Sequence, residues 1–406
     1  MHEGATIDTL YELYDATYLA MTPARWTAAA TRTLFGNPLS PFAYSLPAKM
    51  ITAAAEVWSG VVERHEKAPW DVSARMEVIV ERPFCRLIHF ARDRAPGVTV
   101  PRILLVAPLS GHFATLLRGT VDALLIDHDV YVTDWVDARE VPLAAGRFDL
   151  DDNIAYLLEF IRLLGPAIHL IAVCQPGPAV IAAVALLATW NDPAQPRSMT
   201  VMGGPVDPRA AETAPTLLAE QQSLEWFEQN CTTIVPARYP GAGRRVYPGF
   251  LQIGAFIAMN TKRHVDTHIE MFNDLVRGDG DSAAARRKFY DEYLTVMDVT
   301  AEYYLQTIET VFKTFALPRG TMMWRGEPVL PKAIERTALM TVEGENDDIS
   351  APGQTLAAQA LCSSIPDSKR ANYLVPGVGH YGIFNGSRWR SDISKRITDF
   401  IDSNDQ

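Results

Sequence analysis

Cysteine is scarce in this chain, and its cysteines lie far apart. The 406 residues include only four of them, and no two form a C-x-x-C pair. Structural zinc sites and disulfide frameworks need several thiols at short, regular spacings. The pattern therefore excludes both and predicts reduced thiols, with no metal site. The four are Cys85, Cys174, Cys231 and Cys362.

An excess of positive charge is also missing. Lysine and arginine total 37 against 48 aspartates and glutamates, so the formal net charge is -11. A nucleic-acid-binding surface needs a basic stripe that neutralises phosphates. The composition therefore excludes a nucleic-acid partner.

Long hydrophobic runs are lacking as well. The strongest apolar run, at 178–190, is shorter than the roughly 20 residues that a membrane-spanning helix needs. The N-terminus carries acidic residues early and has no basic segment followed by an apolar one, as a secretory signal would. We expect a cytoplasmic protein without a transmembrane segment.

What the chain does contain is an alternation of short apolar runs and helical stretches. The runs are largely apolar on consecutive positions, which is typical of strands buried on both faces of a parallel sheet. Strands that alternate with helices predict an α/β fold with a mostly parallel, doubly wound sheet. The predicted strands lie within 76–93 (two strands broken by Pro83), 101–109, 129–135, 168–174, 198–204, 336–344 and 370–377.

The alternation of strands and helices is interrupted in two regions. Residues 1–70 have apolar side chains at helical spacing and predict an N-terminal helical segment. Residues 205–331 show amphipathic helical patterns and no buried strand, which predicts a helical cap inserted into a core made of 71–204 and 332–406. A cap over the carboxyl edge of the sheet would shape a pocket there.

The aromatic residues of this cap have two interpretations. They could form an apolar entrance for a bulky substrate, or they could be the core of the cap. They are Trp226, Phe227, Tyr247 and Phe250.

A thiol stands at the sharpest turn of the predicted sheet. The strand at 168–174 ends in Cys174, and an alanine-rich helix follows Pro176. A nucleophile between a strand and a helix is the nucleophile elbow of the α/β-hydrolase fold, where the helix N-terminus favours a thiolate and an oxyanion. The usual G-x-S-x-G is altered, because Ala172 and Pro176 replace the glycines. A buried, inert cysteine remains the alternative.

Two further residues occur in the order that this fold requires. An acid and then a histidine should follow the nucleophile, each after a later strand. The turn after 336–344 offers Asp347 and Asp348, and the turn after 370–377 offers His380. We favour Asp347 from its spacing after the strand, with Asp348 as a cap or orienting group. Capping and packing roles are the alternatives.

The oxyanion that forms during attack needs amide donors. One would be the N–H of Gln175, since Pro176 has none, and the other would come from the loop after the strand at 101–109. Ser110 lies where that donor is expected, and Gly111 and His112 are candidate substrate-binding residues beside it. Trp135, at the end of the next strand, is a candidate wall of the site or a support for this loop.

Together these motifs resemble a known family, the intracellular polyhydroxyalkanoate depolymerases of the poly(3-hydroxybutyrate) type with a cysteine nucleophile. The resemblance covers nearly the whole chain. It implies an α/β-hydrolase that cleaves polyester granules with a Cys174–His380–Asp347 triad and needs no cofactor. The motifs are APLSGHFATLLRGT, VYVTDW, VCQPGP, GGPVD, VEGENDDIS and GVGHYGIFNGSRW.

Three other functions stay open at this point. A polyhydroxyalkanoate synthase or acyltransferase shares the fold, but synthases usually have glycines around the cysteine and a DHIVP-like acid turn, whereas this chain has Ala172, Pro176 and DDISAP. A small-molecule esterase or thioesterase, and a catalytically silent granule-coat protein, are the others. The expected partners are a granule surface or hydroxyalkanoate oligomers, and a homo-oligomer is possible.

Overall fold

The computed structural model describes residues 9–35, 37, 44–95, 97, 99–259 and 261–405. Its centre is an eight-stranded sheet in the order β1-β2-β4-β3-β5-β6-β12-β13. The strands are β1 Arg75–Arg82, β2 Cys85–Ala91, β3 Arg102–Val106, β4 Asp129–Trp135, β5 Ile168–Val173, β6 Ser198–Met202, β12 Ala338–Gly344 and β13 Arg370–Val375.

The sheet has one antiparallel strand among parallel ones. β2 pairs antiparallel with β1 and β4, and every pairing from β4 to β13 is parallel. β5, β6 and β12 are buried along their whole length, as expected for strands covered on both faces. Each predicted strand region contains a strand of this sheet. The predicted α/β-hydrolase fold is therefore confirmed.

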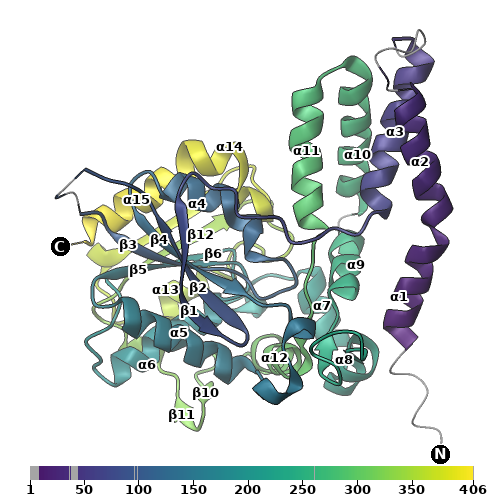
Figure 1. Cartoon of the computed structure of the whole chain (residues 1–406). Coiled ribbons are helices and arrows are strands. Elements are labelled where there is room, and N and C mark those ends of the chain that lie inside the picture. Colours follow the sequence, from purple (N-terminus) through teal and green to yellow (C-terminus); the bar gives the residue numbers. More distant parts are fainter. Residues whose placement is uncertain are drawn as a thin grey trace, which may run out of the picture.

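Helices cover both faces of the sheet (Figure 1). α4 (Arg118–Leu124) and α15 (Ser394–Ser403) lie on one face, while α5 (Leu150–Leu164) and α6 (Gly177–Thr189) lie on the other. α5 begins after Asp149, whose carboxylate accepts the N–H of Asp152 at 3.0 Å. α6 is apolar all round, and accordingly its residues 177–187 are all buried.

The insertion between β6 and β12 is not purely helical, which corrects the sequence prediction. Strands β7 (Thr233–Ile234), β8 (Arg245–Tyr247) and β9 (Val299–Thr300) form a small antiparallel sheet. Val246 and Val299 are buried in it. Strands of two or three residues are too short to leave a periodic signal in the sequence. The helices of the insertion are α7 Ala214–Gln221, α8 Leu224–Cys231, α9 Gly249–Met259, α10 Thr261–Arg277, α11 Gly280–Tyr293 and α12 Ala301–Thr307.

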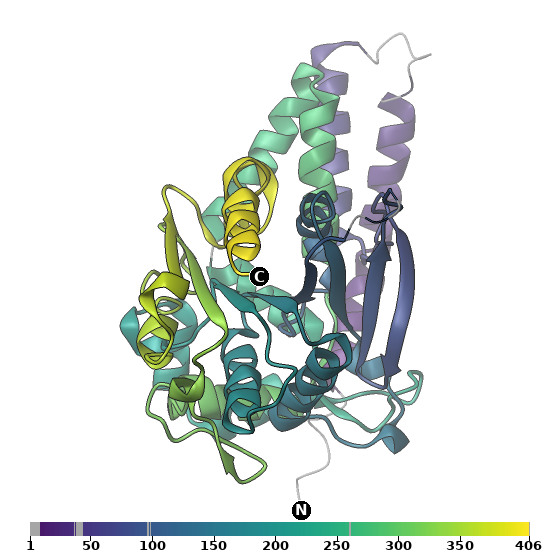
Figure 2. The ribbon, with the colours of Figure 1, turned by 90° about the vertical axis from the view of Figure 1, so that its left-hand side faces the viewer.

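A helical bundle projects from one side of this core (Figures 1 and 2). It joins α2 (Thr22–Phe35) and α3 (Leu46–Val62) to α10 and α11 of the insertion. The predicted helical segment thus contains helices, but its residues 1–8 lie outside the described ones. Among the described helices, none is both long and apolar enough to span a bilayer.

The first helix, α1 (Thr9–Ala20), is held by a buried carboxylate pair. The hydroxyl of Tyr11 donates to Asp298, and the amide N–H of Asp298 donates to Asp137 at 3.1 Å. Arg139 forms an ion pair with Asp137 at 3.1 Å. Burial, and then the charge of Asp298, raise the pKa of Asp137 to about 8. One of these two carboxyl groups therefore holds a proton near neutral pH.

Candidate active site

Cys174 occupies the turn between β5 and α6 in a left-handed backbone conformation. Its φ is +67°, which is rare for a residue other than glycine. Its N–H donates to the carbonyl of Met202 at 2.7 Å. Two neighbouring glycines make room for the turn, because a Cβ on Gly177 would lie 2.9 Å from Val201 and one on Gly204 would lie 2.7 Å from the Cys174 carbonyl oxygen. These glycines, rather than those of G-x-S-x-G, permit the tight approach here.

His380 lies between the thiol and a carboxylate. Its Nε2 is 3.1 Å from Cys174 Sγ, and its Nδ1 is 2.8 Å from Asp347 Oδ2. Asp347 follows β12, and His380 follows β13 at the start of a short 3-10 helix, so parallel strands bring all three to one edge of the sheet. His380 and Asp347 are both buried.

Of the two candidate acids, Asp347 is the favoured one, and it hydrogen-bonds to the histidine. Its Oδ2 faces His380, and its Oδ1 accepts the N–H groups of Ile349 and Ser350, both at 2.9 Å. These two bonds fix the carboxylate plane. Asp348 instead lines a separate cavity.

The electrostatics of the site favour a charged histidine. Burial by itself lowers the pKa of His380, but the neighbouring Cys174 and Asp347 outweigh burial and raise that pKa well above its ordinary value. The site therefore stabilises the imidazolium that His380 becomes when it takes a proton. A cysteine attacks as its thiolate, so a neighbouring histidine that readily holds a proton suits this chemistry.

The loop after β3 lies across from the nucleophile and is tied to it through Gln175. The Gln175 side chain accepts the N–H of Leu109 at 3.2 Å and donates to the hydroxyl of Tyr303 at 2.5 Å. Ser110 and Gln175 line the same cavity as Cys174. Within the described residues, the backbone N–H groups of Ser110 and Gln175 donate to no protein acceptor. Both amides therefore remain candidates for the predicted oxyanion donors.

Gly111 has a steric reason to be glycine. Its φ is +106°, and a Cβ there would lie 2.6 Å from Gln252 Oε1 of the insertion. Its carbonyl accepts the N–H of Met297 at 2.7 Å. Gly111 therefore joins the loop to the insertion by close backbone contact.

The structure does not place His112 or Trp135 in the lining of the cavity that holds Cys174, and a role for them in substrate binding stays a prediction. Trp135 is buried, and its indole N–H donates to the carbonyl of Ala107 at 2.8 Å, so it supports the loop. His112 is buried against Phe256 and Tyr381. Burial, and then the charge of His380, lower the pKa of His112 to about 4, so it is neutral at pH 7.

The cavity that holds Cys174 has a volume of about 540 Å³ and is mainly apolar. The aromatic residues predicted for the cap lie in two different places. Phe227 and Tyr247 line the cavity, whereas Phe250 stacks on Tyr14 at 4.5 Å and so belongs to the packing of the first helix. Tyr303, which also lines it, had no signal in the sequence. Other apolar lining residues are Leu109, Pro205, Leu218, Phe256, Met259, Val299, Ile308 and Phe312.

In the part of the chain that the structure describes, no group of three or more His, Cys, Asp or Glu side chains could hold a metal ion.

Comparison with solved structures finds matches of low sequence identity. A hydrolase from Pseudomonas aeruginosa has 11% identity and a TM-score of 0.47, with 81% of this chain and 99% of that one covered. Naproxen esterase from Bacillus subtilis has 13% identity and a TM-score of 0.42, with 88% of this chain and 98% of that one covered. The monoacylglycerol lipase of Paleococcus ferrophilus has 12% identity and a TM-score of 0.41, with 75% of this chain and 96% of that one covered.

No curated protein matches the sequence. A family model does match, however. The family described as "PHB de-polymerase C-terminus" matches residues 203–405, which is half of the chain. PHB is poly(3-hydroxybutyrate). The matched half contains both turns that supply Asp347 and His380. The chain is a carboxylic ester hydrolase with the α/β-hydrolase fold, and it belongs to the PHB depolymerase family.

Proposed function

We propose that Cys174, His380 and Asp347 form a catalytic triad that hydrolyses the ester bonds of poly(3-hydroxybutyrate) through an acyl-thioester. One observation carries the proposal. It is the continuous chain of contacts from Cys174 Sγ to His380 Nε2, and from His380 Nδ1 to Asp347 Oδ2, at 3.1 and 2.8 Å. Nucleophile, base and orienting acid have this arrangement in triads on many folds.

The first half-reaction transfers the acyl group to sulfur. His380 takes the proton of Cys174, and the thiolate attacks the ester carbonyl carbon to form a C–S bond. The oxyanion accepts hydrogen bonds from the N–H groups of Gln175 and Ser110, and each such donor lowers the barrier by about 3 kcal/mol. The C–O bond then breaks, and His380 gives its proton to the leaving alkoxide, which departs as an alcohol.

The second half-reaction regenerates the thiol. Water gives a proton to His380 and attacks the thioester carbonyl. The C–S bond breaks, the product leaves as a carboxylic acid, and the thiolate recovers the proton from His380. The products are 3-hydroxybutyrate units or oligomers. Both steps use only water and the side chains and amides of this site, so the proposed mechanism calls for no metal or organic cofactor.

The apolar lining of the cavity supports an aliphatic polyester as the substrate. Each repeat of poly(3-hydroxybutyrate) has a methyl and a methylene group that an apolar wall can desolvate. We further propose that the protein acts on granules of this polymer in the cytoplasm. Large exposed apolar side chains on the projecting helices, among them Trp26 at 75% and Trp58 at 45% exposure, support contact with such a surface.

Hydrolysis of native amorphous granules tests the triad. We expect the wild type to release 3-hydroxybutyrate or its oligomers and Cys174→Ala to release none, while both bind granules in sedimentation. Cys231→Ala is the matched control and should keep wild-type activity, because Cys231 is not among the residues that line the cavity. Full hydrolysis by Cys174→Ala would exclude the proposed nucleophile.

Three other outcomes, two of them with further substrates, would favour the rival functions. Granule binding without any turnover by the wild type would indicate a coat protein. Growth of polymer from 3-hydroxyacyl-CoA would indicate a synthase, and cleavage of soluble esters without cleavage of granules would indicate a small-molecule esterase.

A further inference from the structure

Two hydroxyl groups of one helix lie in the apolar cavity that holds Cys174. Tyr303 and Thr307 are one turn apart on α12, so they share a face of that helix, and both line the cavity. Both residues are buried, with exposures of 2% and 8%. A buried polar group costs free energy unless a hydrogen bond satisfies it. The partners of these two hydroxyls therefore bear on what the cavity binds.

Gln175 fixes the role of the Tyr303 oxygen. The amide oxygen of Gln175 faces the backbone N–H of Leu109 at 3.2 Å, because that N–H can only donate. The amide NH₂ of Gln175 therefore lies 2.5 Å from the hydroxyl oxygen of Tyr303, which accepts its hydrogen bond. The hydroxyl proton of Tyr303 is left for another acceptor.

The hydroxyl of Thr307 makes no hydrogen bond to any residue that the structure describes. It nevertheless lies near Tyr303. Burial raises the pKa of Tyr303, Gln175 and Thr307 lower it, and the charge of the nearby Cys174 raises it. The two hydroxyls carry two protons, and a contact between them would use only one. At least one proton of the pair therefore has no acceptor in the described part of the chain.

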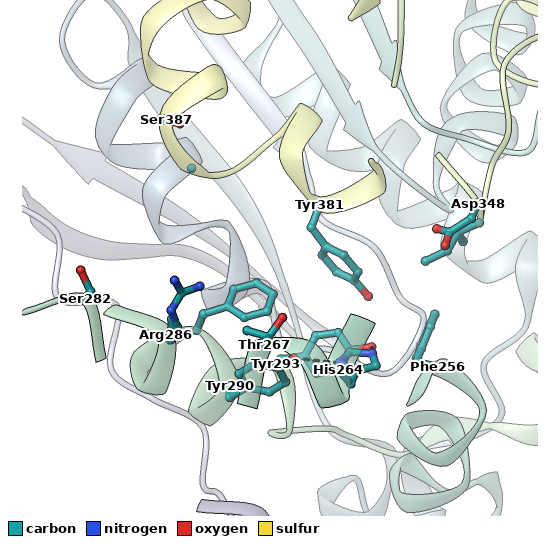
Figure 3. A pocket seen from close by; sticks show the side chains of 13 residues that line it. Phe256, His264, Thr267, Ser282, Arg286, Tyr290, Tyr293, Asp348, Tyr381 and Ser387 are labelled. Carbon is teal, nitrogen blue, oxygen red and sulfur yellow. Dashed lines mark hydrogen bonds between the residues drawn. The ribbon is translucent and has the colours of Figure 1, made fainter. Parts of the chain in front are cut away.

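The polar groups of a neighbouring cavity differ in this respect. Figure 3 shows that cavity, and Phe256 is in the lining of both. There, His264 Nδ1 lies 3.0 Å from the hydroxyl of Tyr290, and Arg286 forms an ion pair with Asp274 at 3.0 Å. These groups are satisfied within the protein. The hydroxyl pair of α12 therefore needs a ligand as its explanation more than these groups do.

A polyester supplies the acceptor that this proton lacks. Every repeat within a poly(3-hydroxybutyrate) chain has an ester carbonyl, which accepts hydrogen bonds, and no donor. A hydrocarbon chain of the same length has no oxygen there and would leave the hydroxyl unsatisfied. A site that is built to hydrogen-bond its substrate disfavours an analogue without the matching group. Such a pair would therefore distinguish a polyester from a simple hydrocarbon ester.

We infer that Tyr303 and Thr307 form a specificity site that donates a hydrogen bond to a second ester carbonyl of the substrate, beside the one that Cys174 attacks. The inference rests on the proposed function, because it takes the substrate and the attacked carbonyl from that proposal. The acyl segment and the leaving segment of a polyester both carry such a carbonyl, and two pairs of substrates distinguish them.

The substrate pairs are soluble esters with and without the second carbonyl. On the acyl side, p-nitrophenyl 3-acetoxybutyrate has it, and p-nitrophenyl 3-methylhexanoate is the hydrocarbon analogue. On the leaving side, methyl 3-(butyryloxy)butyrate has it, and 2-hexyl butyrate is the analogue. We expect the wild type to cleave the oxygenated ester of one pair with a kcat/KM about tenfold above that of its analogue. Equal values within both pairs would overturn the inference.

Removal of both hydroxyls should abolish the preference. The double variant Tyr303→Phe/Thr307→Val keeps the shape of both side chains, and we expect its kcat/KM values for the preferred pair to differ by less than about twofold. The loss of the acceptor for Gln175 affects both esters of a pair, so it cancels in this ratio. Thr310→Val, at a position outside the cavity lining, is the matched control and should keep the wild-type ratio. A double variant that keeps the wild-type ratio would contradict the inference.

Stability separates recognition from a structural role. A buried hydroxyl without a protein partner can be replaced by an apolar group of the same shape at little cost, so Thr307→Val alone should leave Tm unchanged or raise it. A lower Tm would show that the hydroxyl has a partner in the protein, and the inference would fail. Hydrolysis that persists in Cys174→Ala would overturn the proposed function instead.

Discussion

Replacing Asp347 by asparagine tests the proposed triad at its most constrained point. The amide is nearly isosteric with the carboxylate, but the surroundings allow it one orientation. Oδ1 accepts two N–H groups, from Ile349 and Ser350 at 2.9 Å each, so the amide oxygen must stay there. The amide NH₂ then faces His380 Nδ1 across 2.8 Å.

This orientation reverses the tautomer of the histidine. Nδ1 must accept a hydrogen bond from the amide, so the neutral ring carries its proton on Nε2, facing the thiol, and cannot remove the thiol proton. Loss of the carboxylate also removes one of the charges that raise the pKa of His380. We expect kcat to fall by about 10⁴-fold, or about 5 kcal/mol, as when the acid of a catalytic triad becomes an amide.

The measurement is the release of p-nitrophenol from p-nitrophenyl butyrate, together with the rate of alkylation by iodoacetamide at pH 7. Alkylation follows the thiolate fraction and should slow in the same variant. Thermal unfolding should change little, since both amide contacts to Oδ1 persist. Asp348→Asn is the control and should retain p-nitrophenyl butyrate activity. Activity of Asp347→Asn within about threefold of wild type, or an equal loss in Asp348→Asn, would refute the reasoning.

Three other substitutions have defined outcomes. Gly203→Ala should lower both kcat and Tm, because φ is +56° and the new Cβ would lie 2.6 Å from Ile383 Cδ1; normal values of both would contradict the steric argument. Gln175→Leu should reduce kcat more than it changes KM in steady-state kinetics, since the buried Leu109 N–H loses its acceptor at a cost of about 1–3 kcal/mol. Asp137 has an ordinary pKa of 3.8 and a native-state pKa of about 8, so the native state holds a proton there that the unfolded chain has lost. Its contribution to the free energy of unfolding therefore falls as pH rises from 3.8 to about 8. Urea unfolding at pH 5 and pH 8 measures this effect. Asp137→Asn should reduce the difference in the free energy of unfolding between the two pH values, and an unchanged difference would count against the buried pair.

Local pattern was sufficient for much of the fold. β5, β6 and β12 are short apolar runs, and burial on both faces is what such runs require, so their positions followed from the local hydrophobic pattern. The β7-β8-β9 sheet was missed because it depends on pairings between distant segments. Thr233 pairs with Val246, and Val246 pairs with Thr300, across intervals that no local window contains.

By itself, the sequence determined the fold class, the turn that presents Cys174 and the order in which an acid and a histidine follow it. These depend on residue type and on hydrophobic period, which are properties of neighbouring positions. Only the tertiary structure decided that Asp347 rather than Asp348 faces His380, that Trp135 supports the loop from behind, and that the Gln175 side chain ties that loop to the nucleophile. The physical reason is that hydrogen bonds and cavities join residues far apart in the chain, and their geometry follows from the packing of whole elements.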